Sequence, residues 1–102
     1  MIRVIALADL WDGDMTGVVV GGRKLLLVRK GDEVRAFEDR CAHLGVPLSE
    51  GTLAGDVLTC RAPHYQYDAC TGHGINPAMA RLRRYPVAIR DGEVFVDFGG
   101  WA

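Results

Sequence analysis

Two short stretches of this sequence decide how the chain is expected to fold and what it can bind. They are Arg40-Cys41-Ala42-His43-Leu44-Gly45-Val46-Pro47-Leu48-Ser49-Glu50-Gly51 and Thr59-Cys60-Arg61-Ala62-Pro63-His64-Tyr65-Gln66-Tyr67-Asp68. One residue separates Cys41 from His43, three separate Cys60 from His64, and sixteen lie between His43 and Cys60. The Gly and Pro residues around both pairs favour loops. Thiolate and imidazole are ligands that zinc and iron–sulfur clusters share, so the two pairs predict a four-ligand metal site.

The arrangement of the ligand types bears on which metal is bound. Structural zinc sites usually take two Cys from one segment and two His from another. Here each loop supplies one Cys and one His, which suits a binuclear site with two thiolates on one iron and two imidazoles on the other. The alternative is that the Cys are small buried apolar residues and the His are ordinary polar ones. We expect Cys70 and His73 to be loop residues near the site and not ligands.

These stretches resemble the Rieske 2Fe–2S proteins, whose pattern is Cys-x-His, about sixteen residues, and then Cys-x2-His. The resemblance also includes Pro47–Gly51 and Tyr67-Asp68, and it covers nearly the whole chain. Within the family the chain is most similar to the ferredoxin components of multicomponent soluble di-iron monooxygenases of the toluene, alkene or isoprene type. The closer match is carried by 10–15, 48–51, 59–62 and 71–77.

The second motif departs from the family pattern by one residue. The family places its second His three positions after the Cys, where this chain has Pro63, and His64 follows. Proline has no side chain that can ligate a metal. We therefore expect His64 to reach the second iron by a changed loop path, the alternative being another ligand, for which Cys70 and His73 are the spare thiol and imidazole.

The resemblance implies an electron carrier and not an enzyme, because four protein ligands leave no coordination position for a substrate. It implies an NADH-dependent flavin reductase as electron donor, and as acceptor a di-iron hydroxylase that oxidises alkenes or aromatics. The alternatives are the ferredoxin of a ring-hydroxylating dioxygenase, the small subunit of an assimilatory reductase, and a zinc-stabilised binding module.

We expect the two imidazoles to mark the docking face, with Leu44, Val46, Pro47 and Pro63 as an apolar patch. Donors to the sulfurs are expected around 44–46 and at Tyr65 or Tyr67.

Composition limits the other possibilities. The 102 residues suffice for a single domain, and 12 Lys and Arg against 13 Asp and Glu give a net charge of −1, which argues against nucleic-acid binding. The apolar runs are too short to span a bilayer, and the N-terminus has no signal-peptide pattern. Three Cys residues suit a reducing compartment, so we expect a cytoplasmic monomer. The basic run Arg81–Arg84 is either a solvated strand face or a contact for an acidic partner.

The remaining pattern predicts an all-β Rieske fold. A β-sandwich-like base carries a loop-rich cluster-binding subdomain at about 40–79, within a single domain of residues 1–102. We expect Gly21-Gly22 and Asp91-Gly92 to be hairpin turns, Trp11 to pack on the core, and Pro86 either to help cover the site or to mark a strand entry. The predicted strands are 2–7, 16–20, 24–29, 33–38, 57–60, 65–67, 82–90 and 93–98.

Overall fold

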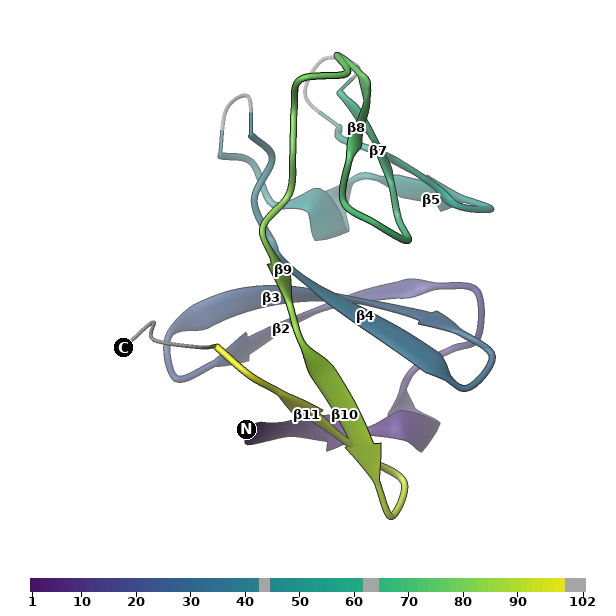
Figure 1. The fold of residues 1–102 in the computed structure, drawn as a ribbon, viewed down its shortest axis with the longest axis vertical. Helices are drawn as coiled ribbons and strands as arrows, with labels where there is room; N and C mark the ends of the chain where they lie inside the picture. The colour runs from purple at the N-terminus through teal and green to yellow at the C-terminus, as the bar shows by residue number, and fades with distance from the viewer. Residues whose placement is uncertain (43–44, 62–64, 99–102) are drawn as a thin grey trace.

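The fold is nearly all β, as predicted, and its strands form three antiparallel sheets (Figure 1). The computed structural model describes residues 1–42, 45–61 and 65–98. Sheet A has the order β1 (Ile2–Ala6), β11 (Glu93–Val96), β10 (Val87–Arg90). Sheet B has the order β2 (Met15–Val20), β3 (Arg23–Lys30), β4 (Glu33–Glu38), β9 (Arg84–Tyr85). Sheet C has the order β5 (Thr52–Ala54), β6 (Val57–Thr59), β7 (Gln66–Asp68), β8 (Gly74–Asn76). Two single 3-10 turns, η1 (Leu7–Asp9) and η2 (Leu48–Glu50), join these strands.

Two tight turns set the register of the lower part of the molecule, which consists of sheets A and B. Gly21 and Gly22 have φ of 55° and 81° and join β2 to β3, with Val20 opposite Arg23. Asp91 and Gly92 have φ of 52° and 73° and join β10 to β11. Positive φ at both central residues is the geometry of the favoured two-residue hairpin, so both predicted turns are confirmed.

β3 separates two hydrophobic cores. Its residues Leu25, Leu26, Leu27 and Val28 are all fully buried. Because side chains alternate along a strand, Leu25 and Leu27 enter one core while Leu26 and Val28 enter the other. The base core lies between sheets A and B and also contains Leu10, Val34, Ala36, Tyr85, Val94, Val96 and Phe98. The site core faces sheet C and also contains Phe37, Cys41, Leu48, Leu58, Cys60, Tyr67, Ala69, Ala80 and Leu82.

Phe37 interrupts the alternation of apolar and polar residues along β4, because both faces of that strand are buried at its C-terminal end. Val34 and Ala36 belong to the base core, whereas Phe37 belongs to the site core. A Cβ on Gly72 would lie 3.0 Å from the Phe37 ring, so the glycine makes room for it. The same strand therefore carries the chain from the base to Cys41.

Two strand predictions were wrong. The described residues of the segment 40–79 hold four short strands, and the sequence indicated only the middle two. Strands of three residues are too short to show a period of two. The predicted single strand 82–90 is two strands in different sheets, because β9 pairs with β4 and β10 pairs with β11. Pro86, which has no N–H to donate, stands between them, and its carbonyl accepts from the Asp97 N–H at 3.0 Å.

One single-residue expectation was wrong, and another is decided between its two alternatives. Trp11 is 77% exposed, because its neighbour Leu10 takes the place in the base core. Of the two alternatives for Pro86, the strand entry is the one observed, because β10 begins at the next residue, Val87. Since Ala36 pairs with Tyr85, the chain at Pro86 runs along β4 away from Cys41. Among the described residues, no helix has the length and apolar character needed to span a bilayer.

Candidate metal centre

The two predicted cysteine ligands come together in the site core. Cys41 follows β4 and is 1% exposed, and Cys60 follows β6 and is 2% exposed. None of the three cysteines is in a disulfide. Two thiols from separate loops, buried in one apolar environment, are a donor pair suited to a single soft metal ion.

The first loop is closed by its own backbone. The Cys41 N–H donates to the Val46 carbonyl at 2.8 Å, and the Gly45 N–H donates to the Cys41 carbonyl at 3.0 Å. Gly45 has a φ of 70°, which an L side chain rarely adopts. A Cβ there would also lie 3.2 Å from Nε of Arg40. These bonds hold the Cys41 backbone fixed at the start of the loop.

The second loop is the turn of the β6–β7 hairpin. The Cys60 N–H donates to the Tyr65 carbonyl at 2.8 Å, and the register continues with Thr59 opposite Gln66 and Leu58 opposite Tyr67. Four residues, 61–64, therefore connect the two bonded positions. The extra residue in the second motif falls within this connection.

Tyr67 reaches from β7 to the first loop. Its phenol oxygen lies 3.4 Å from Sγ of Cys41 and accepts a hydrogen bond from the Ala42 N–H at 3.1 Å. Burial raises the pKa of the Tyr67 phenol, and the hydrogen bond with Cys41 raises it further, while the Ala42 N–H lowers it. The phenol therefore keeps its proton at neutral pH and can donate it toward the sulfur. Tyr67 is thus one of the two tyrosines that the sequence predicts as hydrogen-bond donors to the cysteine sulfurs.

A buried carboxylate anchors the first loop to sheet B. The Asp39 carboxylate accepts hydrogen bonds from the Ser49 N–H at 2.8 Å and from the Ser49 hydroxyl at 2.6 Å. Gly17 of β2 permits this approach, because a Cβ on it would lie 2.8 Å from Ser49 Oγ. Sequence reasoning missed this pair. The only available signal was an acidic residue just before the first motif and a serine just after it.

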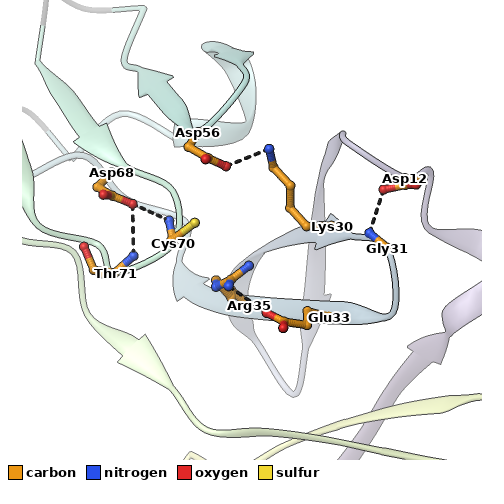
Figure 2. A network of polar contacts seen from close by, with 9 residues as sticks. All are labelled: Asp12, Lys30, Gly31, Glu33, Arg35, Asp56, Asp68, Cys70 and Thr71. Carbon is orange, nitrogen blue, oxygen red and sulfur yellow. Dashed lines mark hydrogen bonds and ion pairs between the residues drawn. The ribbon is translucent and has the colours of Figure 1, made fainter.

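The hydrogen bonds of Cys70 and His73 are made with residues other than Cys41 and Cys60. Cys70 lies beyond the opposite end of β7 from the second loop, where its N–H donates to Asp68 Oδ1 at 2.7 Å (Figure 2). Partial burial raises the pKa of the Cys70 thiol, and the carboxylates of Asp56 and Asp68 add to this, while Arg35 lowers it. His73 is exposed. Its backbone forms an isolated antiparallel β-bridge with Arg81, and its Nε2 lies 3.5 Å from Nη1 of Arg81.

One ion pair joins sheet C to the base on this side. Lys30 Nζ at the end of β3 lies 2.6 Å from Oδ1 of Asp56, in the β5–β6 turn (Figure 2). Lys30 holds the pKa of the Asp56 carboxyl below its ordinary value of 3.8. The Asp56 carbonyl also accepts from the Ala69 N–H at 2.8 Å. The contact ties the turn of sheet C to β3.

The remaining predicted residues lie outside the part of the chain that the structure describes. These are the ligands His43 and His64 and the patch residues Leu44 and Pro63. Val46 and Pro47 of the same patch are half-buried. Within the described ranges, no three His, Cys, Asp or Glu side chains gather as a metal site.

Comparisons with known proteins give a family and close relatives. Residues 1–86 match the model of the Rieske [2Fe-2S] domain. The chain is 38% identical to the ferredoxin component of the alkene monooxygenase system of Xanthobacter autotrophicus (strain ATCC BAA-1158 / Py2), over 93% of this chain and 79% of that one. It is 33% identical to the ferredoxin component of the naphthalene 1,2-dioxygenase system of Pseudomonas putida, over 94% of this chain and 93% of that one.

A solved structure gives the same result for the fold. It is a complex of reduced oxygenase and oxidised ferredoxin in carbazole 1,9a-dioxygenase. The TM-score is 0.83 and the identity 37%, over 94% of this chain and all of the matched chain.

Proposed function

Because the chain belongs to the Rieske [2Fe-2S] domain family, we propose that it is a ferredoxin that passes single electrons to the oxygenase component of a multicomponent oxygenase system. The similarity to ferredoxin components over more than nine-tenths of the chain carries this proposal. A zinc-stabilised binding module fits neither the family nor these relatives.

We propose that Cys41 and Cys60 bind one iron and that His43 and His64 bind the other. The two buried sulfurs in one core support the first pair. The mixed Cys and His content of each loop supports the second pair. When bound, the cluster supplies reversible one-electron chemistry at a potential raised by its imidazole ligands.

The chain's own residues hold and tune this group. The closed backbone of the first loop and the β6–β7 hairpin fix the two sulfurs. Tyr67 donates toward Cys41, and a donor to a ligand sulfur favours the more negative, reduced state. The apolar side chains of the site core keep water from the sulfurs. With four ligands from the protein, a substrate has no position on the metal, so the role is carriage and not catalysis.

The proposed donor is an NADH-dependent flavin reductase, and the proposed acceptor is a di-iron hydroxylase that oxidises alkenes or aromatics. The similarity to an alkene monooxygenase component favours this acceptor. The oxygenase of a Rieske dioxygenase is the second candidate, favoured by the similarity to the carbazole 1,9a-dioxygenase complex. A cytoplasmic location stays a prediction.

The test is electron delivery to purified partners. The protein is reduced with NADH and catalytic reductase, and is then mixed without oxygen with either oxidised acceptor. Rapid reoxidation by the di-iron hydroxylase, with hydrocarbon oxidation once oxygen is admitted, supports the first acceptor. Reoxidation by the dioxygenase alone supports the second. Failure to accept electrons from any reductase, or to deliver them to either acceptor, contradicts the proposed function.

A further inference from the structure

A cationic groove lies beside the first loop. It has a volume of about 660 Å³ and is lined by Arg23, Lys24, Arg40 and Arg83, among others. These residues come from the start of β3, from the segment after β4 and from the approach to β9, so the fold gathers charges that are distant in sequence. Lys24, Arg40 and Arg83 are exposed, so the groove opens to solvent.

Cations outnumber carboxylates in the lining of the groove. Two carboxylates, those of Glu38 and Asp39, line it against the four cations among the described residues. Asp39 is 7% exposed, and both of its oxygens accept hydrogen bonds from Ser49. The chain as a whole carries a net charge of −1, so this concentration of positive charge is local.

The groove adjoins the proposed metal centre. Arg40 directly precedes Cys41, and its guanidinium lies over Gly45 of the first loop. Gly45 and Pro47 of that loop are themselves part of the lining. A molecule seated in the groove therefore touches the loop that carries the first cysteine.

A smaller hollow continues this surface. Its volume is about 220 Å³, and it shares Lys24, Asp39 and Pro47 with the larger groove. Its lining includes Val19, which is 67% exposed. The lining also includes Glu50, whose carboxylate pairs with Arg61 at 2.8 Å. The cations of the larger groove, with an exposed apolar side chain next to them, suit a transient protein contact.

We propose that this groove docks an acidic surface segment of the oxygenase component, and so positions that component against the first loop. The proposal rests on the proposed function. Charge complementarity selects an acidic partner, since opposite charges at an interface steer encounter and fix orientation. The oxygenase is chosen because the matched solved structure is a complex of oxygenase with ferredoxin.

The test compares two double variants with the same loss of charge. K24Q/R83Q neutralises two exposed cations of the groove, whereas R3Q/R90Q neutralises two exposed cations on sheet A. Oxidation of each reduced holoprotein by its oxygenase is followed by stopped flow at low and at physiological ionic strength. We expect K24Q/R83Q to lower the second-order rate constant about tenfold at low ionic strength, and less as salt screens the charges. R3Q/R90Q should stay near wild type.

A competition experiment gives a second measurement. Hexaglutamate peptide should slow oxidation of the wild-type protein by the oxygenase and should have little effect on K24Q/R83Q. A neutral hexaserine peptide, with the ionic strength matched by added salt, is the control and should slow oxidation much less than hexaglutamate does.

Each outcome bears on the proposal. Equal losses in both double variants, or no loss in K24Q/R83Q, would each overturn the groove as an oxygenase dock. In those cases the wild-type protein still carries electrons, so the proposed function survives. If the wild-type protein does not reduce the oxygenase at all, the proposed function fails and the docking proposal fails with it.

Discussion

The phenol oxygen of Tyr67 lies 3.4 Å from Sγ of Cys41, across a distance of 26 residues in the sequence. The same oxygen accepts the Ala42 N–H, so the hydroxyl proton is available to the sulfur. A donor to a ligand sulfur stabilises the reduced state of the cluster more than the oxidised state.

Replacing Tyr67 with Phe should therefore lower the midpoint potential. Loss of a differential stabilisation of about 1 kcal/mol corresponds to a fall of about 40 mV for one electron. The measurement is a redox titration followed by EPR. Tyr85→Phe is the matched control, because Tyr85 is buried in the base core, where its ring lies edge-on to Phe98 with ring centroids 5.2 Å apart. An unchanged potential in Tyr67→Phe, or an equal fall in both variants, would exclude this role.

The three cysteines should differ sharply in their effect on iron content. Cys41→Ser and Cys60→Ser should each abolish stable incorporation of iron, because each removes a proposed thiolate ligand. Cys70→Ser should retain wild-type iron and sulfide, because Cys70 lies at the opposite end of β7. The measurement is iron and sulfide per chain in purified protein. Loss of iron in Cys70→Ser would show that the ligand set is wrong.

The link between Asp39 and Ser49 should contribute strongly to stability. Asp39→Ala leaves the Ser49 N–H and hydroxyl without their partner, and should lower the free energy of unfolding by about 3 kcal/mol. Asp14→Ala is the control, because Asp14 accepts the Met15 N–H at the same distance of 2.8 Å but is exposed. Asp14→Ala should lower the free energy of unfolding by only about 0.5 kcal/mol. Equal costs in urea unfolding of the holoproteins would refute the anchoring role.

The ion pair between Lys30 and Asp56 should make a small, pH-dependent contribution. Since the pKa of Asp56 in the folded protein is lowered, its stabilising effect is present above the ordinary value of 3.8. It is lost as the pH falls through the lower folded value. Asp56→Asn should thus lower the urea midpoint slightly at neutral pH, and the difference from wild type should close in that acid range.

Substitutions at both ends test whether the pair itself is responsible. Lys30→Gln should reproduce the effect of Asp56→Asn at neutral pH, and the double variant should lose no more than either single one. Additive losses would mean that the two residues act through other contacts.

The base could be predicted from the sequence because its signals are local. The turns at Gly21-Gly22 and Asp91-Gly92 need positive φ at both positions, and the residues there allow it. The continuous apolar run 25–28 indicated a strand, but not that it divides two cores. The second core exists only because sheet C packs on the face of β3 that points away from sheet A.

In sheet C and its loops, the sequence predicted the two cysteines and the two middle strands and little else. Cys41 and Cys60 stand out by residue type and spacing, and burial in one core agrees with that prediction. β5 and β8 were missed because their three-residue strands carry no period, and Asp39–Ser49 was missed because nothing local marks a buried acceptor. The groove cations come from three separate segments, so only the fold shows that Lys24 and Arg83 lie together.

The central claim is a Rieske centre held by two cysteines and two histidines, and the most direct measurement is low-temperature EPR of the dithionite-reduced protein with iron and sulfide assayed on the same sample. We predict a rhombic spectrum with an average g value below that of the free electron, together with two irons and two sulfides per chain. An EPR-silent protein that contains one zinc per chain would contradict the account.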